Sequence, residues 1–137
     1  YALPYMKKKN FGRIINISSI NGLIGFAGKS AYNSAKHGVI GLTKVTALEV
    51  AEYNITANAL CPGYVDTALV RGQFEDLAKT RNISTEQVLD EVLFPLIPQK
   101  RLLEVAEIVS LAKYLASEES RGMTGQSLVL DGGYTTQ

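Results

Sequence analysis

Three residues that could move a proton lie close together in the first third of the chain. Tyr32 and Lys36 are four residues apart, so on a helix they share one face. A phenol ordinarily ionises near pH ~10, and an ammonium held beside it favours the ionised form. Ser19 lies thirteen residues before the tyrosine, and its hydroxyl could hold a substrate oxygen. The set predicts an enzyme that moves a proton on or off an alcohol.

Alternating strand and helix patterns position these residues. The β-branched run at 12–18 indicates a buried strand ending in serines, and a glycine-rich loop at 20–28 leads into a helix at 29–53. We also expect a helix end at 1–9, a strand at 55–61, two helices between 66 and 93, a helix at 105–116 and a strand at 126–130. This alternation predicts an α/β fold with parallel strands and right-handed crossovers.

Two further segments follow strand ends in the same way. Cys61-Pro62-Gly63-Tyr64-Val65-Asp66-Thr67 follows the second strand, and Asp131-Gly132-Gly133 follows the last. With the Ser-x12-Tyr-x3-Lys spacing, they make essentially the whole chain resemble the short-chain dehydrogenase/reductase family. The resemblance implies the C-terminal half of a Rossmann-type doubly wound parallel sheet with a small two-helix lid insertion. Residues 1–137 would then form part of a single domain.

The resemblance implies a nicotinamide cofactor, but the usual glycine-rich turn for its pyrophosphate does not occur in this sequence. Gly22, Gly25 and Gly28 follow a different strand with a different spacing, so we expect them to allow a backbone turn. The chain starts at Tyr1 and already resembles helix there, so we expect a dinucleotide-binding N-terminal half in a longer protein. NAD is the expected cofactor, with NADP left open, and the chain alone is expected to be inactive.

The family resemblance also assigns roles to matching positions. Tyr32 would be the acid/base, Lys36 would favour its ionisation and bond the nicotinamide ribose, and Ser19 would orient the substrate oxygen. From spacing alone, the Pro62-Gly63 pair indicates a simple turn. The implied cofactor-binding residues are Tyr32, Lys36, Pro62, Gly63, Val65 and Thr67.

Within the family, the chain is most similar in its motifs to bacterial 3-hydroxybutyrate dehydrogenases. The shared motifs are Gly28-Lys29-Ser30-Ala31-Tyr32, Leu69-Val70-x-x-Gln73 and the C-terminal segment from Asp131. In those enzymes a lysine and a glutamine, here Lys29 and Gln73, help to hold the substrate carboxylate. This chain departs where Asn21 replaces a histidine and Tyr64 replaces a tryptophan. The implied substrate is 3-hydroxybutyrate or acetoacetate, bound by Ser19, Asn21, Lys29, Tyr64 and Gln73.

Residues 66–100 are expected to form a substrate lid. The segment starts at the carboxyl edge of the sheet, where ligands bind in open α/β folds. Ser84 and Gln87 form a capping-box pattern for its second helix, and Pro95 and Pro98 break the chain. A packing excursion without substrate contact is the alternative. Reduction of another carbonyl, such as a 3-oxoacyl thioester or a sugar alcohol, and an inert fragment also stay open.

Composition favours a globular protein that acts on small molecules. With 14 basic and 13 acidic residues the net charge is +1, which indicates no affinity for nucleic acid or a membrane surface. Cys61 is the single cysteine, so it cannot form an internal disulfide, and we expect a buried structural thiol in a reducing, cytoplasmic compartment. No metal site is predicted. Apolar residues on nearly every face of the 29–53 helix predict contact with another subunit, and the family resemblance implies a homotetramer.

Overall fold

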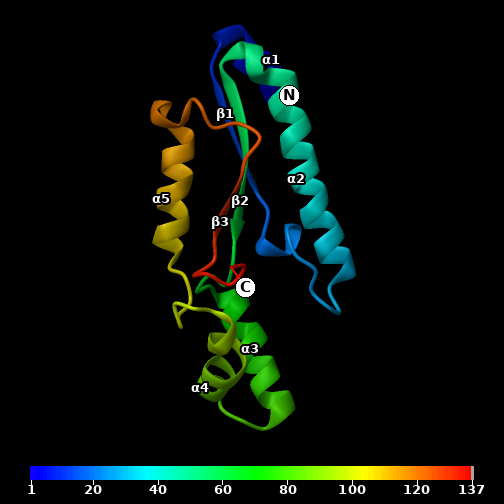
Figure 1. The fold of residues 1–137 in the computed structure, drawn as a ribbon, viewed down its shortest axis with the longest axis vertical. Helices are drawn as coiled ribbons and strands as arrows, with labels where there is room; N and C mark the ends of the chain where they lie inside the picture. Colours follow the sequence, from blue (N-terminus) through cyan, green and yellow to red (C-terminus); the bar gives the residue numbers. More distant parts are fainter. Residues whose placement is uncertain (137) are drawn as a thin grey trace.

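A three-stranded parallel sheet forms the centre of the computed structural model, which describes residues 1–136 (Figure 1). The strands are β1 (Gly12–Ile17), β2 (Ile55–Pro62) and β3 (Ser127–Leu130), in the order β1-β2-β3. The α-helices are α1 (Ala2–Lys9), α2 (Ser30–Val50), α3 (Ala68–Arg81), α4 (Thr85–Val88) and α5 (Val105–Ala116). The predicted α/β class and parallel pairing are confirmed.

The register of the sheet brings the carboxyl ends of the strands to one edge. Ile17 at the end of β1 pairs with Leu60, and Pro62 at the end of β2 pairs with Leu130 at the end of β3. The central strand β2 is buried along its whole length except at Pro62. The segments that follow the strands therefore leave the sheet close together, as the sequence predicts.

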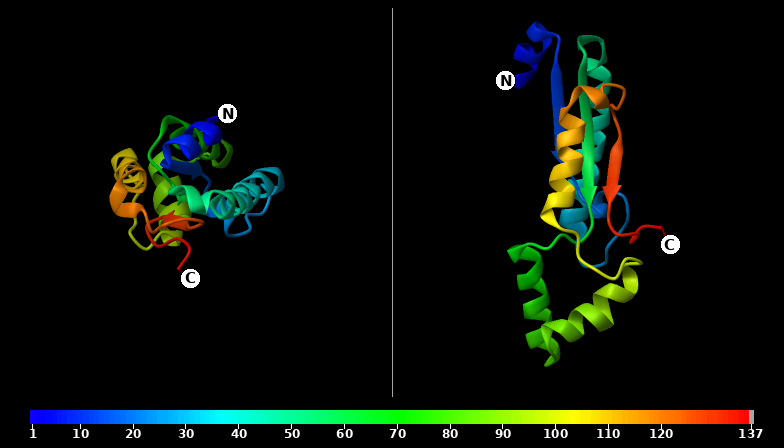
Figure 2. Two further views of the ribbon diagram at one scale, coloured as in Figure 1. Left: turned by 90° about the horizontal axis from the view of Figure 1, so that it is seen from above. Right: turned by 90° about the vertical axis from the view of Figure 1, so that its left-hand side faces the viewer.

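Helices α2 and α5 lie on opposite sides of this sheet, as Figure 2 shows. The buried apolar residues of α2 are Ile40, Ala47 and Val50, which recur at helical spacing on one face. On the outward face, Leu42 and Leu48 are 61% and 82% exposed. The predicted contact of this helix with the sheet is confirmed, and its outward apolar residues are left uncovered. Among residues 1–136, the helices lack the length and apolar character needed to cross a bilayer.

Residues 66–100 extend beyond the carboxyl ends of the strands (Figure 1). They hold α3, α4, a π-helical turn at Leu89–Leu93 and a 3-10 turn at Phe94–Leu96, packed around a small apolar core. The capping box predicted at Ser84 forms, with hydrogen bonds in both directions to Gln87. The expected second helix is present, but it is α-helical only over Thr85–Val88 and continues as the π-helical turn. Pro95 has no N–H to donate, so a regular helix cannot continue through it.

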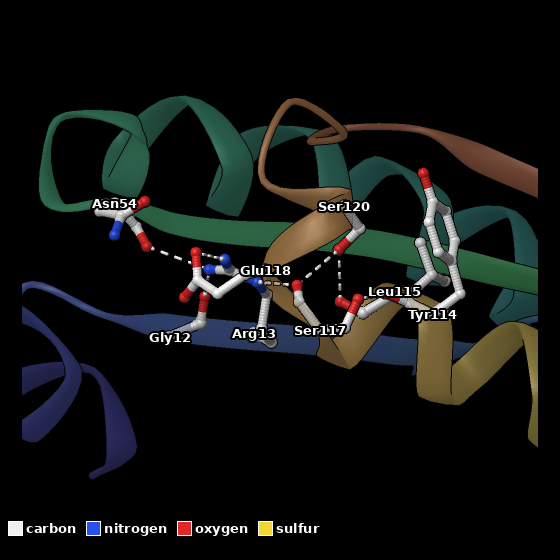
Figure 3. Close-up of polar contacts among 8 residues, drawn as sticks. All are labelled: Gly12, Arg13, Asn54, Tyr114, Leu115, Ser117, Glu118 and Ser120. Carbon is white, nitrogen blue, oxygen red and sulfur yellow. Dashed lines mark hydrogen bonds and ion pairs between the residues drawn. The ribbon is translucent and has the colours of Figure 1, made fainter.

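At the opposite edge, where the strands begin, Arg13 of β1 connects three segments (Figure 3). Its Nε donates to the main-chain oxygen of Ser117 at 3.1 Å, and its Nη1 donates to those of Gly12 at 2.9 Å and Asn54 at 3.2 Å. Nη2 lies 3.4 Å from Oε2 of Glu118, while the arginine side chain is only 4% exposed. One buried cation thus joins the starts of β1 and β2 to the turn after α5.

That turn has hydrogen bonds of its own. The Ser120 hydroxyl donates to the main-chain oxygens of Leu115 and Ser117, and the Ser117 hydroxyl donates to that of Tyr114 (Figure 3). Ser120 is fully buried. The Ser117 carbonyl that receives Arg13 is therefore held in place by the end of α5.

Candidate active site

The end of β1 and the N-terminal part of α2 are joined by direct contacts. Ser18 extends the ladder by donating its N–H to Leu60, and its hydroxyl donates to the main-chain oxygen of Lys36 at 2.9 Å. Gly22 fills the remaining space, since a Cβ there would lie 2.6 Å from the Ser18 Oγ and 2.8 Å from the Lys36 oxygen. The position of α2 relative to the strand end is therefore fixed by contact.

The predicted shared face of Tyr32 and Lys36 is present. The Lys36 Nζ lies 5.6 Å from the centre of the Tyr32 ring and donates to the main-chain oxygen of Ile17 at 3.0 Å. An ammonium has three N–H groups, so two stay available after this bond. Tyr32 is 47% exposed, which leaves its phenol open to a ligand.

Ser19 is the second residue after β1 and caps a short 3-10 helix at Ile20–Gly22, where the sequence predicts only a loop. Its Oγ accepts a hydrogen bond from the Asn21 N–H at 3.2 Å. Because that bond uses a lone pair of the oxygen, the serine O–H is left to donate to another group. Gly28 has a φ of +80°, consistent with the predicted turning role of the glycines.

A cavity of about 330 Å³ opens over these residues. It brings together all five predicted substrate-binding residues, together with Tyr32 and Gly63. Its lining is Ser19, Ile20, Asn21, Lys29, Tyr32, Gly63, Tyr64, Leu69, Val70 and Gln73. The strand ends, the start of α2 and the first turns of α3 supply these side chains, so residues far apart in the sequence meet at one place.

Four predicted cofactor residues do not line this cavity. Lys36 lies beside Tyr32 on α2, and Pro62 ends β2. Val65 forms an isolated bridge with Leu103, and the Thr67 hydroxyl caps α3 by accepting from the Val70 N–H at 3.3 Å. All four nevertheless sit at the same edge of the sheet as the cavity.

Sequence reasoning missed three apolar members of the lining, Ile20, Leu69 and Val70. Leu69 and Val70 precede Gln73 by four and three residues, so they share its face of α3. Extending the helical face of Gln73 back to the start of α3 would have found them. Ile20 follows Ser19 directly and has no distinguishing signal.

Tyr64 forms one wall of the cavity and differs in character from Tyr32. Its ring centre lies 6.1 Å from that of Phe74 and 5.8 Å from that of Tyr134. Burial, followed by the proximity of Tyr134 and a hydrogen bond with it, raises the pKa of Tyr64 to about 12. Tyr64 therefore stays a neutral phenol at physiological pH and suits a binding surface better than a proton-transfer role.

The floor of the site depends on close backbone approaches. Gly63 donates to the Leu130 oxygen at 2.9 Å, and a Cβ at Gly63 would lie 2.9 Å from both Cα and Cβ of Asp131. The Asp131 carboxylate accepts hydrogen bonds from Gly133 N and from the N–H and hydroxyl of Thr135. Cys61, as predicted, is a fully buried free thiol, and burial raises its pKa.

A family model and curated relatives match nearly the whole chain. Residues 1–135 match the family model described as enoyl-(acyl carrier protein) reductase. The uncharacterized oxidoreductase YxjF of Bacillus subtilis is 69% identical over 137 residues, which are 100% of this chain and 53% of the relative. A D-beta-hydroxybutyrate dehydrogenase of Rhizobium meliloti is 52% identical over 136 residues, 99% of this chain and 53% of the relative. The chain therefore spans about half the length of the curated relatives that it matches.

Solved structures also match the chain over nearly all of its length. A short chain dehydrogenase family protein from Francisella tularensis superposes with a TM-score of 0.87 at 34% identity, over 90% of this chain and 51% of that one. The F189W actinorhodin polyketide ketoreductase, solved with NADPH, superposes with a TM-score of 0.88 at 33% identity. The match covers 96% of this chain and 50% of that one. With nearly all of its length matched by the family model and by these folds, the chain belongs to the short-chain dehydrogenase/reductase family.

Proposed function

We propose that this chain is part of an NAD(P)-dependent oxidoreductase that interconverts a short 3-hydroxy acid and its 3-oxo acid. The best candidate pair is 3-hydroxybutyrate and acetoacetate. The observation that carries the proposal is the cavity lining, in which Ser19 and Tyr32 stand together with Lys29 and Gln73. The first two suit an alcohol or carbonyl oxygen, and the second two suit a carboxylate. The 52% identity to a D-beta-hydroxybutyrate dehydrogenase supports the same choice.

In the oxidation direction, Tyr32 acts as the base. Its phenolate oxygen takes the proton of the substrate hydroxyl while the carbon–oxygen double bond forms. A bound nicotinamide would supply the hydride acceptor for the substrate C–H bond. Ser19 donates its free O–H to the reacting oxygen, and the Lys36 charge beside the Tyr32 ring favours the phenolate. In the reduction direction Tyr32 returns the proton.

The residues at the strand ends fit a nicotinamide nucleoside. Lys36 has two N–H groups left for ribose hydroxyls after its bond to Ile17. Gly63 lines the cavity beside Tyr32, and its close approach to Asp131 makes main chain part of the cavity wall, on which we propose that a flat ring lies. We propose Pro62, Val65 and Thr67 as further contacts. NAD is our first candidate, and the NADPH bound to the similar ketoreductase supports the cofactor class.

The carboxylate would be held from two sides. Lys29 precedes Tyr32 by three residues, and its Nζ lies 4.9 Å from the centre of the Phe26 ring. Gln73 is exposed on α3, within the segment 66–100 that we propose as a lid. Closure of α3 over the cavity would bring the Gln73 amide to the same anion as the Lys29 ammonium.

Reduction of a 3-oxoacyl thioester is the second candidate. The family model matched by residues 1–135 is described for an acyl carrier protein substrate, which favours it. A thioester has no free carboxylate, so it would leave Lys29 and Gln73 without an anionic partner. We therefore rank the free acid first.

The full-length protein is proposed to be a cytoplasmic homotetramer. The free, buried Cys61 suits a reducing compartment. Outward apolar residues on α2 and α5 would be covered by neighbouring subunits. These are Leu42, Val45, Leu48, Val105, Val109 and Tyr114. The 137-residue chain alone, without a pyrophosphate-binding turn in its sequence, is proposed to be inactive.

A coupled assay on the full-length protein tests this proposal. Formation of NADH or NADPH is followed with 3-hydroxybutyrate, its methyl ester, a 3-hydroxyacyl thioester and sorbitol as substrates. We expect the free acid to give the highest kcat/KM. Preference for the ester or the thioester would replace the carboxylate model with the thioester reductase.

A further inference from the structure

A buried amide in α2 has its orientation fixed by the main chain. Asn33 follows Tyr32 directly, is 9% exposed, and donates its Nδ2 to the Ile24 oxygen at 2.9 Å. A main-chain carbonyl can only accept a hydrogen bond, so the NH2 group of Asn33 must face Ile24. The Asn33 Oδ1 consequently points to its other neighbour.

That neighbour is Asn21, whose orientation follows in turn. Its Nδ2 donates to the Asn33 Oδ1 at 3.5 Å, because an oxygen there can only receive a donor. Asn21 is 7% exposed and belongs to the cavity lining. Within residues 1–136 its Oδ1 makes no hydrogen bond, and it is not among the fully enclosed unpaired atoms. Asn21 therefore offers a ligand its Oδ1 as a hydrogen-bond acceptor, beside the second N–H of its Nδ2.

This pair of groups suits a hydroxyl, which can donate to the Oδ1 and accept from the remaining N–H. Two oxygens without a proton between them repel, whereas a hydroxyl can donate to an amide oxygen. The main-chain N–H of Asn21 is 3.2 Å from the Ser19 Oγ, and both residues line the same cavity. The donor should therefore lie close to the reacting carbon of the substrate.

We propose that Asn21, held in this orientation by Asn33, selects a short hydroxy acid with a second hydroxyl beside the reacting carbon. The inference rests on the proposed function and refines its substrate class from a 3-hydroxy acid to a dihydroxy acid. Lys29 and Gln73 keep the carboxylate, Ser19 and Tyr32 keep the reacting oxygen, and Asn21 accepts from the additional hydroxyl. Asn33 does not line the cavity and acts as a positioning residue.

The test compares substrates on the full-length enzyme with NAD⁺ and NADP⁺. The probes are 3-hydroxybutyrate, 2,3-dihydroxybutyrate and 3,4-dihydroxybutyrate. We expect one dihydroxy acid to exceed 3-hydroxybutyrate in kcat/KM by about tenfold or more, because a site built to bond a hydroxyl discriminates against analogues that lack it. Asn21→Leu should reduce this ratio to near one.

The Asn33 variant separates positioning from simple structural support. Asn33→Leu frees the Asn21 amide to rotate, so the substrate ratio should fall although the cavity surface is unchanged. In that background, Asn21→Leu should lower the ratio little further, since coupled residues are not additive. The control is Asn58→Leu, which removes a buried amide bonded to Met123 and Gln126 away from the cavity. It should lower the melting temperature without changing the ratio.

Each outcome decides between the proposals. If 3-hydroxybutyrate is oxidised at least as well as both dihydroxy acids, the inference is overturned while the proposed function stands. If no hydroxy acid is oxidised, the proposed function has failed and the inference fails with it. A ratio that falls equally in Asn58→Leu would overturn the positioning role of Asn33. If Asn33→Leu does not fold, the wild-type ratio and Asn21→Leu still decide the proposal.

Discussion

The polar side chains at the two ends of the three strands differ in their exposure and in their hydrogen bonding. Where the strands begin, Arg13 is 4% exposed and makes hydrogen bonds to three main-chain oxygens. Where they end, Tyr32 is 47% exposed and Lys36 uses one of its three N–H groups on Ile17. A buried cation that is hydrogen-bonded to the main chain stabilises the fold, whereas unused donors at an open cavity can bind something else. Substitutions where the strands begin should therefore change stability, and substitutions where the strands end should change activity.

The largest effect should come from Tyr32→Phe at the open end. Removing the phenolic oxygen in the full-length enzyme should lower kcat by at least ~100-fold, the usual contribution of a general acid/base. The melting temperature should stay close to that of the wild type, since the ring is half exposed. Tyr64→Phe is the matched control, because the Tyr64 phenol stays neutral in the wall of the cavity. Retention of more than a tenth of the wild-type kcat in Tyr32→Phe would exclude the proton-transfer role.

Arg13→Met should give the largest loss of stability. The main-chain oxygens of Gly12, Asn54 and Ser117 would lose a charged donor, and each such bond contributes ~1.5–3 kcal/mol. We expect the free energy of unfolding to fall by about 3 kcal/mol in urea titrations. Below the transition, kcat should match the wild type. The control is Arg71→Met, whose partner Asp66 is on the surface. Equal losses in the two variants would contradict the contrast between the ends.

Gln73→Ala should impair turnover of the free acid more than turnover of its ester. If the amide holds a carboxylate, kcat/KM for 3-hydroxybutyrate should fall roughly 10- to 150-fold, the equivalent of ~1.5–3 kcal/mol. The methyl ester of the same acid should lose far less. Leu69→Ala, a neighbouring change on the same face of α3, should reduce turnover of acid and ester alike. Equal losses for acid and ester in Gln73→Ala would remove the carboxylate contact.

The smallest effect concerns the ion pair of Arg101 and Glu107, which does not line the cavity. Hydrogen bonds from the Arg101 guanidinium, followed by one from the Glu104 N–H, lower the pKa of Glu107 to about 2. A depressed carboxyl pKa stabilises the fold above the ordinary value of 4.5, and this stabilisation is lost as the pH falls toward 2.

Glu107→Gln should therefore lower the melting temperature slightly at pH 7, by an amount that shrinks as the pH falls below 4.5. Thermal melts from pH 7 to pH 2 measure the difference. Glu49→Gln, an exposed change on α2 without an ion pair among residues 1–136, serves as the control. A difference that is constant with pH would exclude the ion pair as its cause.

Local patterns in the sequence were enough to predict the elements and part of the site. The β-branched runs and helical periods gave the strands and helices, and a four-residue spacing was enough to place Tyr32 beside Lys36. The presence of Lys29, Tyr64 and Gln73 in one cavity was expected from the family resemblance, and the order of the strands explains it.

Other features depend on long-range contacts that no local pattern reports. Arg13 meets Ser117 across 104 residues of sequence, and the Asn21–Asn33 pair forms only because the loop folds over α2. The π-helical turn at Leu89–Leu93 is a departure from regular helical hydrogen bonding that periodicity does not predict. In each case the side chain's type was visible in the sequence, but its partner was not.

The close packing of Gly22 has a consequence for protein engineering. Contacts from Ser18 and Ile17 to Lys36 set the placement of α2, and Gly22 fits between them without room for a Cβ. The length of the loop after Gly22 therefore does not determine where the helix sits. Gly25 and Gly28 have open space around them, so extra residues inserted between these two positions would project outward. A peptide tag or a second binding module could be grafted there, at the rim of the cavity, while the geometry of the serine, tyrosine and lysine stays as it is.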